Sequence, residues 1–181
     1  MNIIAKIAEP GYIKVTEASS SSQFGPQAFT IQKSDTLVMD VDLRVEDNLN
    51  EVKVYSNPVS GSGKLLFSIK NGKISGTDFT FSATDWTQIR MVWDLEATEN
   101  NVKVYEKTTG SYELVYTKQV NVDKAPSYIR FQVTADGSAS EKASIHIDDC
   151  YVYTTTDTVY TGETLNKAAS VYEQNYDAAC S

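Results

Sequence analysis

The sequence predicts an all-β protein built as an antiparallel sandwich of two sheets. Apolar and polar residues alternate with a period of two in several segments, turn signals separate these segments, and no confident helix lies between them. The aromatic content also suits strands, because eleven tyrosines stand against six phenylalanines and two tryptophans. Six or more such segments favour a jelly-roll sandwich over alternating β-α units.

The clearest strands lie at 36–45 and 86–95. In the first, one face is apolar and consists of Leu37, Met39, Val41, Leu43 and Val45. The opposite face carries Val38, Asp40, Asp42 and Arg44. In the second, the apolar face holds Ile89, Met91, Trp93 and Leu95, and the other face holds Gln88, Arg90 and Asp94. We assign both tryptophans, Trp86 and Trp93, mainly to the core.

Shorter alternating segments complete the predicted series, at 65–69, 73–74, 102–107, 112–120, 128–134 and 143–153. The pair Asn71-Gly72 predicts a hairpin between the first two, because both residues tolerate positive φ. In the last segment the apolar parity changes at Asp148-Asp149, which predicts a β-bulge there.

The strand pattern ends near residue 155. We therefore expect residues 1–155 to form the sandwich domain and residues 156–181 to form a linker or helical tail. Within 163–179 an apolar stripe predicts one short C-terminal helix, with Leu165, Ala168, Val171, Tyr172 and Tyr176 on it.

Charge and composition exclude several function classes. A net charge of −8 disfavours nucleic-acid binding, because the phosphate backbone repels an acidic surface. No apolar stretch approaches the roughly 20 residues that span a bilayer, so we expect no membrane insertion. Cys150 and Cys180 are expected to be free thiols, with a disulfide between them as the alternative.

The chain resembles laminin-G-like and concanavalin A-like jelly rolls over about residues 29–153. The resemblance rests on TLVMDVDLRV, on WTQIRMVWDL followed by NNVKVYEK, and on the closing IHIDDCYVY. The closing stretch looks like the last strand of many bacterial sandwich domains, including carbohydrate-binding modules attached to polysaccharide-degrading enzymes. The resemblance implies a polysaccharide or glycan partner, an extracellular or cell-surface location and a multidomain parent protein.

A polar sheet face is the predicted ligand site. We expect it to collect side chains from three strands: Asp40, Asp42, Arg44, Gln88, Arg90, Tyr128, Arg130 and Gln132. Carboxylates, amides, Arg and Tyr suit sugar hydroxyls and the C–H face of a sugar ring. The alternative is a solvated face with cross-strand Asp–Arg pairs.

Acidic residues near the two ends of the sandwich predict a structural calcium site. Modules of the resembling kind often hold calcium between the N-terminal segment and the acids of the last strand, which here are Glu9 with Asp148 or Asp149. The alternative is that one aspartate caps a turn and the other is solvated.

Catalytic motifs are not evident, so we expect no enzyme. Glycosidases of this broad fold carry ExDxxE on one strand, and the nearest match, DLEATE at 94–99, misses that spacing. The sequence therefore predicts a non-catalytic polysaccharide-binding module of a larger extracellular bacterial protein. The alternative is a structural or adhesive module of a surface or virion assembly with protein partners.

Overall fold

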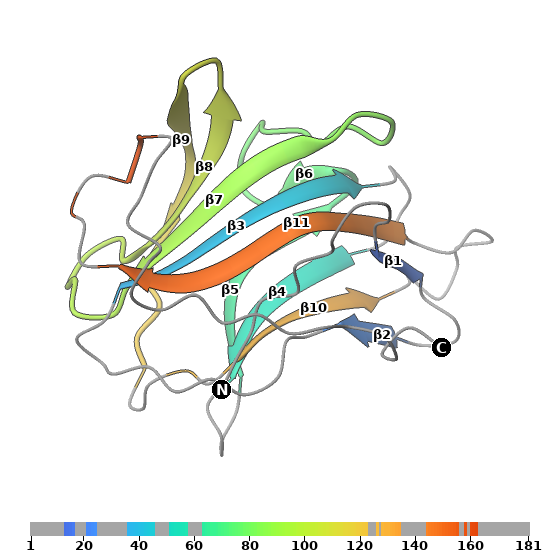
Figure 1. The fold of residues 1–181 in the computed structure, drawn as a ribbon. Helices are drawn as coiled ribbons and strands as arrows, with labels where there is room; N and C mark the ends of the chain where they lie inside the picture. The colour runs from blue at the N-terminus through green and yellow to red at the C-terminus, as the bar shows by residue number, and fades with distance from the viewer. Residues whose placement is uncertain are drawn as a thin grey trace.

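A computed structural model of the chain describes residues 13–16, 21–24, 36–45, 51–57, 63–122, 126, 128–134, 144–155, 158 and 160–162. These residues form two antiparallel sheets packed face to face, and no described residue is helical (Figure 1). The predicted all-β sandwich is confirmed. Among the described residues there is no helix long and apolar enough to cross a membrane. Glu9, Cys180 and the predicted helix at 163–179 lie outside the described residues.

The six-stranded sheet has the order β1-β11-β3-β7-β8-β9. Its strands are β1 (Ile13–Thr16), β3 (Thr36–Val45), β7 (Thr87–Asp94), β8 (Val102–Thr108), β9 (Ser111–Lys118) and β11 (Ser144–Thr155). β11 lies between β1 and β3, so residues distant in sequence become neighbours on adjacent strands.

The five-stranded sheet has the order β2-β10-β4-β5-β6. Its strands are β2 (Ser21–Phe24), β4 (Glu51–Asn57), β5 (Lys64–Lys70), β6 (Lys73–Ile74) and β10 (Tyr128–Thr134). The chain passes between the sheets several times, and β10 belongs to this sheet although β9 and β11 belong to the other.

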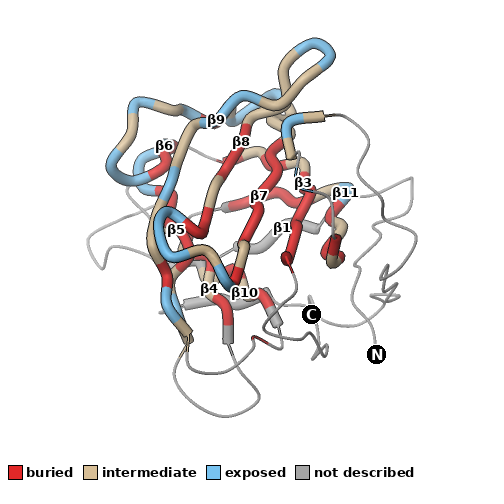
Figure 2. The backbone as a smooth tube through the Cα atoms, turned by 90° about the vertical axis from the view of Figure 1, so that its left-hand side faces the viewer, coloured by how far each residue is buried: buried red, intermediate tan, exposed pale blue. Residues whose placement is uncertain are grey.

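The core lies between the sheets and follows the predicted alternation. The odd-numbered residues of β3, from Leu37 to Val45, are buried against Phe67 and Phe131 of the opposite sheet. Trp93 of β7 lies fully in this core. Figure 2 shows the buried segments along the strands of both sheets and the exposed turns at their ends.

Two local predictions are confirmed. Asn71 and Gly72 have φ of 52° and 70° and join β5 to β6 in a two-residue turn. The register between β11 and β3 shifts after Asp148, and Asp149 has φ of 42° at this β-bulge. The bulge explains why Ile145 and Cys150 both face the core despite their opposite parity.

Candidate functional site

Five predicted site residues share the outer face of the six-stranded sheet, the face turned away from the core. They are Asp40, Asp42 and Arg44 of β3 and Gln88 and Arg90 of β7. The antiparallel register sets Asp40 opposite Arg90 and Asp42 opposite Gln88. Gln88 Nε2 donates to Asp42 Oδ2 at 3.0 Å. The period-two pattern therefore placed these side chains together correctly.

The other three predicted ligand residues do not join this face. Tyr128, Arg130 and Gln132 belong to β10, which pairs with β2 and β4 in the five-stranded sheet. The Arg130 guanidinium lies 4.9 Å from the centre of the Tyr55 ring. The prediction of one continuous three-strand face is corrected, because alternation fixes the two faces of a strand and not the sheet to which it belongs.

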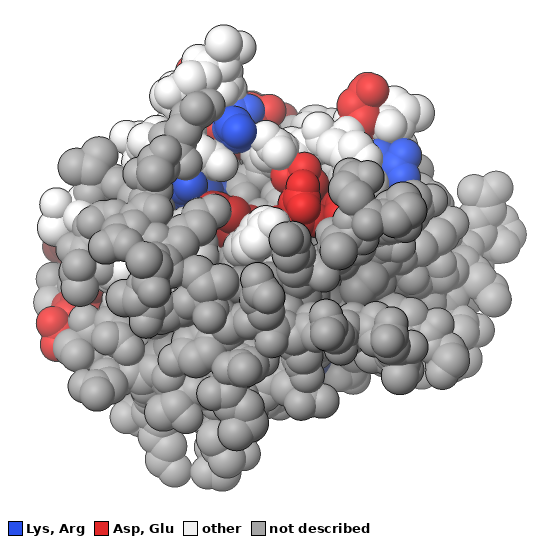
Figure 3. Space-filling view, in the orientation of Figure 1, with Lys and Arg blue, Asp and Glu red and all other residues white. Residues whose placement is uncertain are grey.

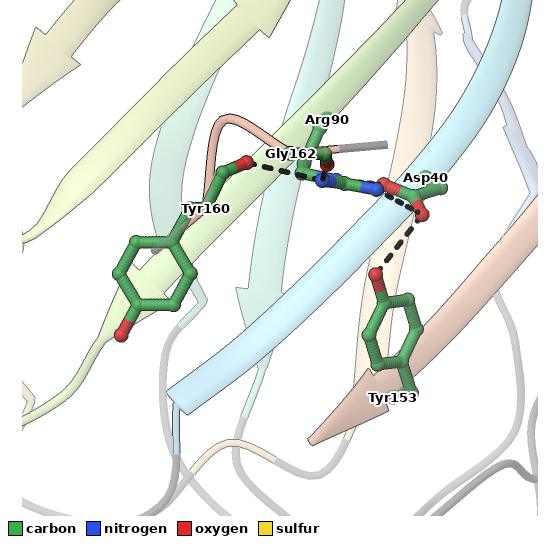
Figure 4. A network of polar contacts seen from close by, with 5 residues as sticks. All are labelled: Asp40, Arg90, Tyr153, Tyr160 and Gly162. Carbon is green, nitrogen blue, oxygen red and sulfur yellow. Dashed lines mark hydrogen bonds and ion pairs between the residues drawn. The ribbon is translucent and has the colours of Figure 1, made fainter. Parts of the chain in front are cut away.

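Arg90 and Asp40 are the centre of a buried polar network (Figure 4). Arg90 Nε donates to Asp40 Oδ1 at 2.7 Å, and Arg90 Nη2 donates to Asp40 Oδ2 at 3.2 Å. The Tyr153 hydroxyl donates to Asp40 Oδ2 at 3.0 Å. Arg90 Nη1 donates to the backbone carbonyls of Tyr160 at 3.0 Å and Gly162 at 2.6 Å.

Ionisation in this network follows from burial and charge. Burial lowers the pKa of Arg90, but the hydrogen bond and the charge of Asp40 more than offset it, so the net shift is upward. Burial raises the pKa of Tyr153, and the negative charge of Asp40 raises it further. Arg90 therefore stays charged and Tyr153 stays neutral, and with Arg90 only 1% exposed the network holds the structure together rather than facing a ligand.

Three residues of the segment after β11 cover this half of the outer face. We call Tyr160, Thr161 and Gly162 the cap. Besides the bonds from Arg90, the Thr161 carbonyl accepts a hydrogen bond from the Tyr112 backbone N–H at 3.0 Å. Tyr160 and Tyr112 pack on outward-facing side chains that are buried, namely Val38, Val92, Tyr105 and Tyr153. The outer face is thus closed at this end.

On the outer face, the row of side chains that follows Asp40 and Arg90 is accessible to solvent. Asp148 of β11 lies opposite Asp42, which lies opposite Gln88, and Lys107 of β8 follows on the same face. All four side chains are half-buried rather than fully buried. We call Asp42, Gln88, Lys107 and Asp148 the polar band. Figure 3 shows this face with acidic atoms between two groups of basic atoms.

The pKa of Asp42 in the polar band is raised above its ordinary value. Burial raises the pKa of Asp42; the hydrogen bond from Gln88 opposes this, and the negative charges of Asp149 and Asp148 add to it. Lys107 exerts a smaller opposing effect. The folded state therefore favours the protonated form of the Asp42 carboxyl more than an ordinary aspartate does.

Trp86 borders the polar band on the side away from the cap. The Arg44 guanidinium lies 4.4 Å from the centre of the Trp86 ring, and Arg44 Nη2 lies 3.3 Å from His146 Nδ1. Trp86 is half-buried and does not belong to the core cluster, so its assignment to the core is corrected. The missed signal was parity: Trp86 has the same parity as Gln88, which faces outward.

The predicted calcium ligands are only partly visible. Asp148 is half-buried, and its Oδ1 accepts a hydrogen bond from the Asp149 backbone N–H at 2.8 Å. Asp149 is exposed, and Glu9 is not among the described residues. Within the described part of the chain, no group of three or more His, Cys, Asp or Glu side chains is arranged to hold a metal ion. Calcium stays a prediction.

Comparisons with known proteins give a fold and no family. No family model matches the sequence, and no curated protein matches it significantly. Among solved structures, the chain is similar to a GH131 β-glucanase catalytic domain from Podospora anserina, with a TM-score of 0.50. The two are 10% identical over 83% of this chain and 73% of that chain. At this identity the likeness shows a shared sandwich fold alone.

This likeness overturns the expectation that the chain is not an enzyme. That expectation rested on the missing ExDxxE spacing on one strand, whereas the similar solved structure is a catalytic domain. The fold instead brings Asp42 and Asp148 together from two strands, β3 and β11, which no motif within one segment can reveal.

Proposed function

We propose that this chain binds a polysaccharide on the polar band of the six-stranded sheet. The observation that carries the proposal is one accessible row of carboxylate, amide and ammonium groups beside a half-exposed tryptophan, Trp86. Sugar hydroxyls bond to such groups, and the C–H face of a sugar ring packs on an aromatic ring. Strand-borne side chains are already ordered, so little conformational entropy opposes binding.

β-Glucan is the polysaccharide class that we propose first. One solved structure with a similar fold is named a β-glucanase. The closing strand IHIDDCYVY also resembles that of carbohydrate-binding modules. An extracellular or cell-surface location belongs to the same proposal, because polysaccharides of this kind are found there. A calcium ion at Asp148 or Asp149 that fixes the bulge beside the band is also part of it.

Hydrolysis of the bound chain is a second candidate function, favoured by the pairing of Asp42 with Asp148. Residues directly opposite each other on antiparallel strands have Cβ atoms about 4.5–5.5 Å apart. Glycosidases that retain the anomeric configuration hold their two carboxyl groups about 5–5.5 Å apart, and each aspartate carboxyl lies one bond beyond its Cβ atom, so this pairing allows such a separation. The raised pKa of Asp42 suits the general acid, and the role of nucleophile then falls to Asp148 at the bulge.

The proposed reaction has two steps. An Asp148 carboxylate oxygen bonds to the anomeric carbon while the glycosidic C–O bond breaks, and the leaving oxygen keeps the electron pair and takes the proton of Asp42. Water then attacks the anomeric carbon, gives its proton to the Asp42 carboxylate and releases Asp148. The new reducing end keeps its anomeric configuration.

A retention assay tests binding. The purified chain is applied to a panel of insoluble polysaccharides and soluble β-glucans, with Gln88→Ala as the site variant and Gln132→Ala on the opposite sheet as the matched control. We expect Gln88→Ala to lose at least about tenfold in affinity and Gln132→Ala to match the wild type. Equal loss in both variants, or no retention by the wild type, contradicts the proposal and favours a structural or adhesive module with protein partners.

A separate assay tests hydrolysis. We expect the wild type to release reducing ends from a β-glucan that it retains, and Asp42→Asn and Asp148→Asn to release none. Proton NMR of the first product should show the retained anomer. Retention without release by the wild type contradicts the hydrolysis candidate and leaves the binding proposal standing.

A further inference from the structure

The outer face of the six-stranded sheet divides into two halves of different exposure. Under the cap, Val38 is 0% exposed and Val92 is 1% exposed, although both point away from the core. Two rows further along the same strands, beyond the buried Asp40 and Arg90, Asp42 and Gln88 are only half-buried. A ligand on this face therefore meets an abrupt boundary between the Asp40–Arg90 row and the Asp42–Gln88 row.

Several contacts fix the cap at this boundary, where it forms a wall beside the polar band. Arg90 donates to two of its carbonyls, and the Tyr112 backbone N–H donates to a third, at Thr161. The Tyr160 ring packs on the outward apolar side chains, and its hydroxyl lies 3.4 Å from Thr36 Oγ1. The Arg90 guanidinium also lies 4.0 Å from the centre of the Tyr112 ring. The wall is thus held by a charged side chain, a backbone bond and an apolar contact.

A second boundary lies on the other side of the polar band. Trp86 and Arg44 stack on each other there, and Arg44 Nη1 also reaches the Thr84 carbonyl at 3.5 Å. Trp86 directly precedes β7, and Arg90 lies four residues further along the chain, or about 13 Å at the usual rise of a strand. Across the strands the band continues through β11, β3, β7 and β8, over about 14 Å at the usual strand spacing. The accessible strip is therefore confined along the strands and continuous across them.

We propose that the cap is the wall that selects an unbranched saccharide chain, lying across the strands between the cap and Trp86, with the Tyr160 ring holding the cap in place from the Thr36 side. This inference rests on the proposed polysaccharide binding. A side branch directed along the strands would meet either the cap or the Trp86–Arg44 pair. Rejecting a competitor by steric conflict is an effective route to specificity, because the conflict does not depend on the strength of the favourable contacts.

Tyr160 is the residue through which the wall can be tested. Tyr160→Ala removes the ring that packs on the outward apolar side chains, and Tyr160→Phe keeps the ring as the matched control. The two ligands are a linear β-glucan oligosaccharide and one with the same backbone and a single-glucose branch. Affinities are measured by isothermal titration calorimetry on the full chain. Amide hydrogen exchange at Tyr112 reports whether the cap has opened, because that N–H bonds to Thr161.

We expect the wild type and Tyr160→Phe to bind the linear ligand at least about tenfold more tightly than the branched one. Tyr160→Ala should reduce that ratio to about threefold or less, with faster exchange at Tyr112 and nearly unchanged affinity for the linear ligand. If Tyr160→Ala does not fold, Tyr160→Leu, which removes the ring and keeps only part of the apolar contact, should lower the ratio of the two affinities in the same direction by a smaller amount.

Three results overturn the inference in distinguishable ways. Equal affinity of the wild type for both ligands shows that the wall selects nothing. If Tyr160→Ala keeps the wild-type ratio of linear to branched affinity while amide hydrogen exchange at Tyr112 is accelerated, the cap is not what rejects the branch. Binding of neither ligand by any variant overturns both this inference and the proposed function, whereas the first two results leave the binding proposal intact.

Discussion

Asp40→Ala is the substitution that most directly tests the buried network under the cap. It removes the acceptor of two hydrogen bonds from Arg90 and one from Tyr153. The Arg90 guanidinium is 1% exposed, so it cannot turn to water without opening the cap. Removing one partner of a buried ion pair costs about 3–5 kcal/mol, because a buried charge is left without compensation. For a chain of this length that corresponds to a fall in Tm of about 6–20 °C.

Urea unfolding followed by tryptophan fluorescence measures this change, since Trp93 is buried in the core. Asp42→Ala is the control, because Asp42 lies two residues along the same strand and is half-exposed, and we expect it to cost less than about 1 kcal/mol. Replacing both partners, as in Asp40→Leu with Arg90→Met, should recover much of the loss. A loss below about 1 kcal/mol in Asp40→Ala contradicts the interpretation of the network as dry and stabilising.

Three further predictions concern protons, thiols and metal. The pKa of Asp42 is raised by burial, so the folded state binds its proton more tightly than the unfolded chain, and the cost of Asp42 to folding grows as pH rises from the unfolded to the folded pKa. The stability of the wild type relative to Asp42→Asn should therefore fall as pH rises above about 4 and level off above the folded pKa in urea titrations, and a flat difference contradicts the shift. Burial raises the pKa of the Cys150 thiol to about 12, so iodoacetamide should leave it unmodified in the native protein and label it after denaturation, as peptide mass spectrometry can show. If calcium binds at Asp148 or Asp149, adding EDTA should lower Tm, and identical melting with calcium and with EDTA shows that prediction to be wrong.

The alternation of apolar and polar residues within single segments, together with the turn residues, was enough to predict much of the fold. The alternation in 36–45 and 86–95 identified the core faces of β3 and β7, because side-chain direction in a strand depends only on position along it. The change of parity at Asp148 and Asp149 predicted the β-bulge for the same reason. The Asn71-Gly72 pair predicted its hairpin because positive φ is a local steric preference.

Sheet membership could not be predicted from that pattern. The alternation of β10 is as regular as that of β7, yet β10 pairs with β4 in the opposite sheet, which separates Arg130 from Arg90. Which strands pair is decided by contacts between distant segments, and period-two alternation contains no information on them. The pairing of Asp42 with Asp148 could not be predicted for the same reason, because it joins two strands that are distant in sequence.

The cap was missed although a local signal for it existed. Val38 and Val92 are apolar residues on the predicted solvent faces of their strands, and each lies next to the predicted polar site residues. Apolar side chains at such positions indicate that another segment covers them. The covering segment, with Tyr160, lies beyond the last predicted strand, in a stretch that we had expected to be a linker or tail.

A crystal structure of the full chain with a bound β-glucan oligosaccharide tests the central claim most directly. We predict sugar rings across β11, β3, β7 and β8, with hydroxyls bonded to Asp42 and Gln88 and one ring against Trp86. A saccharide on the five-stranded sheet near Arg130 and Tyr55, or none at millimolar ligand, contradicts the assignment of the polar band as the binding site.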